Sequence, residues 1–112
     1  MSADGTGRNP ATYIADLAAE VEIPENGTLS RVLYKDHKLR LVVFGFDTGQ
    51  ELTDHTARHS AILYAVSGKL EVTLDGERVD VKPGSWVHMP PNLPHAVRAL
   101  EPSVLVLSLI LG

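Results

Sequence analysis

After Gly27, the apolar residues of this chain gather into short runs that are separated by turn residues. Nine runs have the length of a strand: residues 29–34, 39–46, 51–57, 61–67, 69–74, 78–81, 85–89, 95–99 and 104–110. Short strands at such even spacing are typical of a barrel or a sandwich. Asp75-Gly76 lies between two alternating runs and has the sequence of a two-residue hairpin turn. The pattern therefore predicts an all-β fold.

The segment before these runs has the period of a helix. Asn9 can act as an N-cap, and Pro10 suits the first helical position. Apolar residues then recur at three- and four-residue steps: Tyr13, Ile14, Leu17, Ala18 and Val21. This spacing predicts one short amphipathic helix that ends before Pro24. We also expect a flexible N-terminus over residues 1–12 and a single domain over residues 13–112.

Two segments, residues 39–46 and 104–111, are apolar on both of their faces. The interior of a barrel covers only one face of a strand, so the other face needs a second cover. We expect the N-terminal helix or another copy of the chain to supply it, and we predict a homodimer with the helix or the outer sheet at its interface. The alternative is that the last strand simply lies beneath the helix.

The composition narrows the possible chemistry. The 112 residues include 10 Lys and Arg against 14 Asp and Glu, a net charge of −4, which argues against a nucleic-acid partner. Because the chain has no cysteine, any metal must be bound by His, Asp, Glu or water. No apolar stretch approaches the ~20 residues that span a bilayer, and the polar start does not resemble a signal peptide. We therefore expect a cytoplasmic protein with no membrane partner.

Glycine, histidine and proline have a specific spacing in the second half of the chain. The first set is Gly49, five residues, His55, one residue, Ala57, three residues, Ala61, six residues and Gly68. The second set is Gly84, five residues, Pro90, one residue, Asn92, two residues, His95, three residues and Ala99. A spacer of 15 residues, 69–83, separates the two sets.

These two sets resemble the motifs of the cupin family, G-x5-H-x-H-x3-E-x6-G and G-x5-P-x-G-x2-H-x3-N. In the first motif both glycines and the first His match, whereas Ala57 and Ala61 stand where the family has a second His and a Glu. In the second motif Asn92 replaces a Gly and Ala99 replaces an Asn. The spacer equals the short one of compact single-domain cupins. The resemblance therefore implies a cupin jelly-roll β-barrel, preceded here by the short N-terminal helix.

In cupins the motif side chains hold one divalent metal inside the barrel, where small organic substrates or dioxygen react. Carried over by position, only His55 and His95 stand where ligands are expected. The resemblance thus implies a reduced metal site that lacks the family's carboxylate, a candidate acid or base. We expect no nucleotide and no organic cofactor, because the glycines mark hairpins and none precedes a helix.

His59 offers a third ligand if the chain bends after His55. Two His that share a metal bring their ligating atoms within about 3 Å, whereas residues four apart on a straight strand are separated by roughly 13 Å. A site of His55, His59 and His95 with water is neutral and open, and suits Zn, Ni, Fe or Cu. In the alternative, His59 is a solvated residue at the barrel mouth.

His88 shares its strand parity with Trp86, opposite to Val87 and Met89. If the apolar pair fills the barrel, His88 faces outward, onto a partner subunit; with the reverse parity, His88 lines the pocket. The apolar pair resembles core, which favours the outward orientation. The local sequence predicts that His37 lies in a surface turn, and we assign it no role.

Ala57 and Ala61 also change the expected volume of the interior. Methyl groups in place of an imidazole and a carboxylate leave an apolar pocket beside Leu63, which is the usual form of a small-molecule site. One predicted function is a cupin whose reduced histidine set binds a divalent transition metal and which acts on or binds a small organic molecule. The alternatives are a metal-free cupin that binds a small ligand or regulates without catalysis, and a purely structural dimer with a filled barrel. No residue is assigned a catalytic role.

Overall fold

The structure of the protein, a computed structural model, describes residues 10–112 with the exception of the side chains of Asp54 and His55. Residues 1–9, most of the predicted flexible N-terminus, lie outside the described residues. The described chain contains a 3₁₀ turn (Leu17–Glu20) and the strands β1 (Thr28–Lys35), β2 (Leu39–Phe46), β3 (Glu51–His55), β4 (Ser60–Ser67), β5 (Leu70–Leu74), β6 (Glu77–Val81), β7 (Trp86–Met89), β8 (His95–Ala99) and β9 (Ser103–Ile110). Each predicted strand is present.

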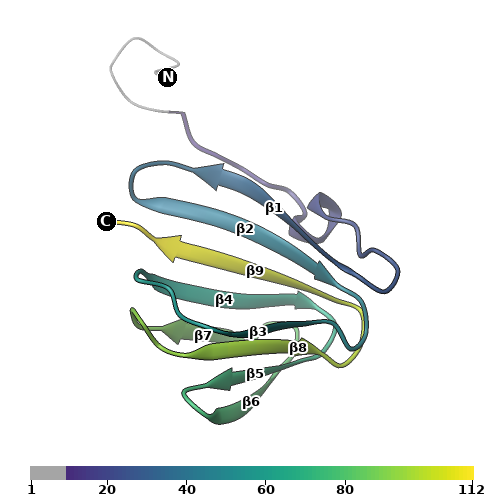
Figure 1. Cartoon of the computed structure of the whole chain (residues 1–112). Coiled ribbons are helices and arrows are strands. Elements are labelled where there is room, and N and C mark those ends of the chain that lie inside the picture. Colours follow the sequence, from purple (N-terminus) through teal and green to yellow (C-terminus); the bar gives the residue numbers. More distant parts are fainter. Residues whose placement is uncertain (1–9) are drawn as a thin grey trace.

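The strands form two antiparallel sheets that lie against each other (Figure 1). One sheet has the order β1-β2-β9-β4-β7, and the other has the order β3-β8-β5-β6. The chain passes from one sheet to the other after β2, β3, β4, β6, β7 and β8, which is the crossing pattern of a jelly roll. The prediction of an all-β cupin-like barrel is confirmed.

The predicted hairpin turn joins β5 to β6. Asp75 and Gly76 both have a positive φ, 49° and 87°, as a type I′ turn requires. The two strands then pair in a continuous register, from Leu74 opposite Glu77 to Leu70 opposite Val81.

Alternate strand residues fill the space between the two sheets. In β4, Ala61, Leu63 and Ala65 are buried, whereas Tyr64 between them is exposed. The same alternation on the other strands builds one apolar cluster, whose buried members are Phe46, Ala61, Leu63, Ala65, Leu70, Val72, Val81, Met89, Val97, Ala99 and Leu105. Removal of this apolar surface from water is the main driving force for closing the barrel.

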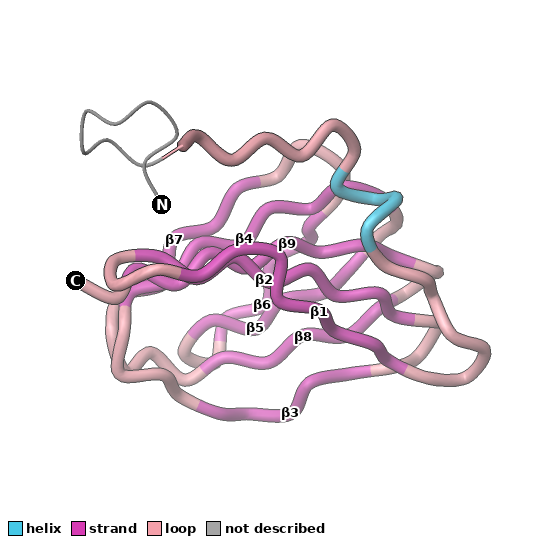
Figure 2. The backbone as a smooth tube through the Cα atoms, turned by 90° about the horizontal axis from the view of Figure 1, so that it is seen from above, coloured by secondary structure: helices cyan, strands magenta, loops and turns pink. Residues whose placement is uncertain are grey.

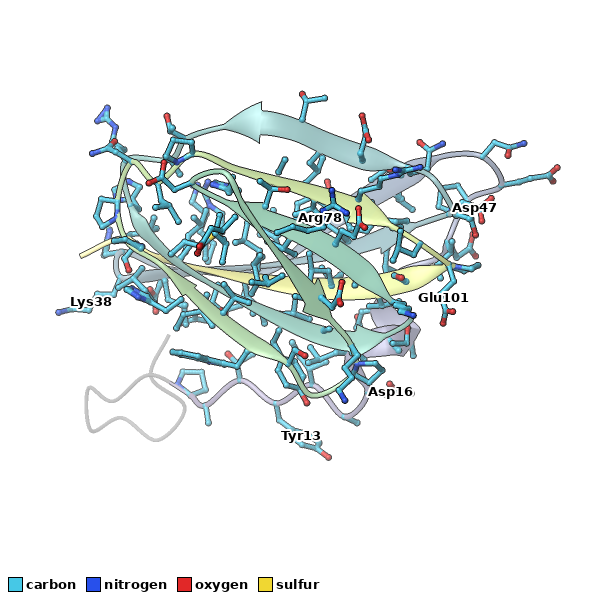
Figure 3. All side chains as sticks on the ribbon, turned by 90° about the horizontal axis from the view of Figure 1, so that it is seen from below. Tyr13, Asp16, Lys38, Asp47, Arg78 and Glu101 are labelled. Carbon is cyan, nitrogen blue, oxygen red and sulfur yellow. The ribbon has the colours of Figure 1, made fainter. Side chains whose placement is uncertain are left out.

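The predicted N-terminal helix is wrong. Among residues 10–112 only Leu17–Glu20 is helical, as a single 3₁₀ turn whose N-cap Asp16 accepts a hydrogen bond from the backbone N–H of Ala18. Tyr13, which the helical pattern placed on an apolar face, is 87% exposed and points away from the barrel (Figure 3). In Figure 2 an extended segment runs along the barrel before the short turn.

An extended segment suits this surface better than a helix. A short helix has little stability of its own in water, so tertiary packing decides its conformation. After the 3₁₀ turn the chain passes so close to β2 that a Cβ at Gly45 would stand 2.7 Å from the carbonyl oxygen of Glu22. The cylinder of an α-helix would hold its backbone further from the sheet.

The same segment covers part of the outer face of the five-stranded sheet. Leu17, Ala18 and Val21 pack against the buried side chains of Val43, Val104 and Val106. The last strand therefore lies beneath the N-terminal segment, as one of the two expectations had it, although the segment is not a helix. The part of this face over β4 and β7 has exposed Tyr64 and Trp86, and the homodimer stays a prediction.

The turn between β1 and β2 is fixed by Asp36. Its carboxylate accepts hydrogen bonds from the Tyr34 hydroxyl and from the backbone N–H groups of Lys38 and Leu39. The bond from Tyr34, followed by the backbone bond from Lys38, holds the pKa of Asp36 below its usual value. These contacts set the point at which β2 begins.

Gly68 supports a specific prediction about stability. Its φ is +86°, and a Cβ at this position would overlap the Ser103 hydroxyl and the carbonyl oxygen of Pro102. Gly76 has a similar φ of +87° but open space around it, so it is a matched control. We expect Gly76→Ala to cost about 1–2 kcal/mol for the left-handed backbone alone, and Gly68→Ala to cost roughly 1–3 kcal/mol more because of the overlap.

Urea unfolding of the two variants beside the unsubstituted protein measures both costs. Equal losses of unfolding free energy in the two variants would contradict the close packing of Gly68 against the loop before β9.

Candidate functional site

His95 is a buried polar side chain in the wall of the barrel. It opens β8 and has the parity of the core residues Val97 and Ala99, and only 8% of it is exposed. Its Nδ1 lies 2.9 Å from the carbonyl oxygen of Leu93. Because a carbonyl can only accept, Nδ1 carries a proton in this contact. The hydrogen bond orients the ring in the wall of the barrel.

The loop before His95 explains one departure from the cupin motif. Asn92, which stands at a glycine position of the motif, has a φ of 66°. Asn tolerates this left-handed conformation better than most residues, so the backbone shape survives the replacement. The N–H of Asn92 donates a 2.7 Å hydrogen bond to the carbonyl of Ala57. The loops that carry the two motifs are thus tied together at one end of the barrel.

The structure brings the two predicted ligand positions onto neighbouring strands. His55 ends β3, and its backbone is the cross-strand partner of His95 on β8. The side chain of His55 lies outside the described residues. His59 is half-buried in the loop between β3 and β4, where the chain makes the bend that a shared site requires.

The described residues do not assemble the metal site that the family motif specifies. No group of three or more His, Asp or Glu donors within metal-binding reach occurs among them. Ala57 and Ala61 occupy two of the motif's ligand positions and have no donor atom. The described donors therefore do not fit a complete metal site.

The predicted pocket residues divide between the interior and the loops. Ala61 and Leu63 are each 3% exposed and face the core from β4. Ala57 is half-buried in the loop that receives the hydrogen bond from Asn92. The methyl group of Ala61 has Leu109 of β9 and Met89 of β7 as cross-strand neighbours, so this part of the wall is apolar.

His88 lies on the outer face of the sheet. It is exposed, its Nε2 stands 2.7 Å from the Ser60 hydroxyl, and its ring stacks on Trp86 with centroids 6.5 Å apart. Val87 and Met89, of the opposite parity, pack in the core. His88 also lines a hollow of about 460 Å³ between the edge strands β6 and β7, so its place is at the edge of the barrel rather than at its centre.

The sequence analysis missed Arg40. This residue is half-buried near the start of β2, at the barrel end where His95 stands. A signal was present, because Arg40 is the one charged residue in the otherwise apolar run of residues 39–46. Arg40 belongs to no motif, and the apolar pattern of its run carries information about burial but not about ligand binding.

A comparison with protein families identifies the class. Residues 42–110 match the cupin domain, which is more than half of the chain, and the chain belongs to the cupin family. No curated protein sequence matches it significantly. None of the described helical segments is long and apolar enough to cross a membrane.

Solved structures show the same fold. A conserved protein of unknown function from Streptococcus pyogenes is 33% identical, with a TM-score of 0.82 over 93% of this chain and 91% of that one. KdgF from Halomonas sp. is 31% identical, with a TM-score of 0.74 over 79% of this chain and 83% of that one. Salicylate 1,2-dioxygenase from Pseudoaminobacter salicylatoxidans is 18% identical and shares the fold alone, with a TM-score of 0.70 over 75% of this chain and 26% of the enzyme.

Proposed function

We propose that this cupin binds a small organic molecule inside the barrel, at the end where His95 stands. The observation that carries the proposal is His95 itself, a buried polar side chain with an oriented ring in a mostly apolar wall. Sites for small molecules combine mostly apolar walls with a few well-placed polar groups. No residue is assigned a catalytic role, so the proposal is one of binding.

The wall around His95 supports the same function. Leu74 is its cross-strand partner on β5, and Ala61 and Leu109, paired with each other, face the interior from the larger sheet. In such surroundings, with little water to compete, a hydrogen bond between His95 and a ligand is stronger than in solution. Salicylate 1,2-dioxygenase, by its name, acts on a small aromatic acid within the same fold, which supports a barrel of this type as suitable for ligands of that size.

The first test distinguishes the roles of the two ring nitrogens of His95. In His95→Asn, the amide nitrogen replaces the Nδ1 donor to Leu93, but nothing replaces Nε2. We expect compounds from a panel of small organic molecules to raise the melting temperature of the unsubstituted protein and to shift the Ala61 methyl resonance. Loss of a buried hydrogen bond costs ~1–3 kcal/mol, so affinity falls by roughly 5- to 150-fold in His95→Asn.

The exposed His37 supplies the control, and His37→Asn keeps the affinity of the unsubstituted protein. The proposal is contradicted if no compound stabilises the protein, or if bound compounds shift only resonances of the outer face.

A divalent transition metal is the second candidate ligand, favoured by the cross-strand pairing of His55 with His95. In this version His55 and His95, with His59 from the adjoining loop, would hold Zn, Ni, Fe or Cu, and the bond from Nδ1 of His95 to Leu93 would help to hold the ring in place. The bound metal would supply a Lewis acid or a redox centre.

Elemental analysis of protein expressed in metal-supplemented medium tests this candidate. We expect about one metal ion per chain, as a single mononuclear site requires, and its loss in both His55→Ala and His95→Ala. His37→Ala retains the metal. A metal-free unsubstituted protein would overturn the candidate and leave the binding of an organic molecule unaffected.

We also propose that the chain forms a homodimer through the exposed outer face of β4 and β7. Trp86 and Tyr64 are cross-strand partners there, and they are 62% and 41% exposed. The adjoining outer-face residues Ile62 and Ser108 carry no charge, so two copies of this face can meet without repulsion between like charges. Exposed aromatic residues of this kind are enriched at interfaces.

Sedimentation velocity tests the dimer. We expect the unsubstituted protein to sediment with the mass of two chains, and Trp86→Ser to weaken association by at least about tenfold because it removes a central aromatic anchor. Tyr13→Ser removes an exposed aromatic residue outside this face and leaves association unchanged. A monomeric unsubstituted protein would rule the dimer out.

A further inference from the structure

We infer that the ligand of the barrel site is a small organic anion and that Arg40 binds its carboxylate. The inference rests on the proposed function, because it names the chemical class of the molecule bound beside His95. It comes from a residue that neither the family motifs nor the predicted ligand set includes.

The strand register places Arg40 on the core face of β2. Arg40 is paired with Leu109 of β9, and Leu109 is paired with Ala61 of β4. Ala61 is buried in the core and Leu109 packs against it. Residues that share such a cross-strand row project from the same face of a sheet. Arg40 thus belongs to the inner wall and not to the outer face.

His95 lies at the same end of the barrel, in the smaller sheet, with Leu74 as its cross-strand partner. The loops from β3 to β4 and from β7 to β8 join the two sheets at this end, and the hydrogen bond from Asn92 to Ala57 ties them together. The two sheets of a sandwich lie ~10 Å apart. An arginine and a histidine projecting from opposite walls at this separation can both reach one small molecule held between them.

Arg40 differs from the other described cations in its burial, because it is half-buried and the others are exposed. Arg31 pairs with Glu20, and Arg78 pairs with Glu71 on the surface of the smaller sheet, each at 3.3 Å (Figure 3 labels Arg78). Across the described residues, no hydrogen bond or ion pair joins the guanidinium of Arg40 to another side chain, although Arg40 is half-buried. A partly desolvated cation without an anion is unfavourable, and a bound anion removes that cost.

The charges around Arg40 favour an anion as well. Its cross-strand partner on β1 is Lys35, a second cation. Among the described side chains of the facing row, the acidic one is Glu77, which is exposed on β6 at the far edge of the smaller sheet. Lys35 therefore adds a positive charge beside Arg40, and Glu77 lies at the far edge of the smaller sheet.

The apolar wall and the guanidinium together define the class of ligand. A guanidinium presents a planar pair of donors that matches the two oxygens of a carboxylate. Leu109 and Ala61 offer carbon surface beside it, which suits an organic acid rather than an inorganic anion. The carboxylate would lie on Arg40, and the carbon skeleton would extend along the apolar wall toward His95.

Matched acids and amides test this assignment. The probes are a panel of aliphatic, aromatic and hydroxy carboxylic acids, the primary amides of the same acids, and inorganic phosphate. We expect the acids to raise the melting temperature and to shift the Ala61 methyl resonance, and the amides and phosphate to do neither. Arg40→Gln should weaken binding of the best acid by about tenfold or more, and Arg40→Lys, which keeps the charge but not the paired donors, should weaken it less.

Arg98→Gln is the control variant. It removes the same charge from the exposed outer face of the smaller sheet, in the row of Glu51 and Glu71, and should leave the affinity for the acid unchanged. Amides that bind as tightly as acids, with no effect of Arg40→Gln, would overturn the role of Arg40 and leave the proposed barrel site intact. Phosphate that competes equally with the acids would overturn the assignment to an organic anion. Failure of every acid and every amide to bind would instead contradict the proposed function.

Discussion

Strand β9 has apolar side chains on both faces, so neither face can be left to water without a large loss of hydrophobic stabilisation. β9 lies in the middle of its sheet, between β2 and β4, where both of its faces can be buried. Leu105 faces the interior of the barrel, while Val104 and Val106 lie beneath Leu17 and Val21 of the N-terminal segment. The interior of the barrel buries one face of β9, and the N-terminal segment buries part of the other face.

The candidate site depends on the end of the barrel where both motif loops meet. The bond from Asn92 to Ala57 holds the loops together, and the bond to Leu93 holds the ring of His95. Rigid placement of this kind matters for a binding site because a ligand then need not spend binding energy on ordering the protein. The replacement of two motif ligands by alanine leaves the scaffold unchanged and alters what the scaffold can hold.

The polar groups at this end have different origins in the sequence. The spacing of the second motif predicts His95, and the structure shows it buried on the core face of β8. Arg40 belongs to no motif, and its place beside the site follows from the pairing of β2 with β9, strands that are some sixty residues apart in the chain. The N-terminal helix failed as a prediction for a related reason, because helical periodicity in a short segment says little about the surface against which the segment packs.

By itself, the sequence determined the strands, the hairpin at Asp75-Gly76, the membership of the cupin family and the two motif histidines. These are local properties, because alternation, turn residues and motif spacing each depend on residues that are close together in the sequence. Only the tertiary structure decided that the N-terminal segment is extended, that His88 lies on the outer face, and that Arg40 joins the row of Ala61. Each of these depends on which distant strand lies beside the residue, and that choice is made by packing over the whole barrel rather than by any one stretch of chain.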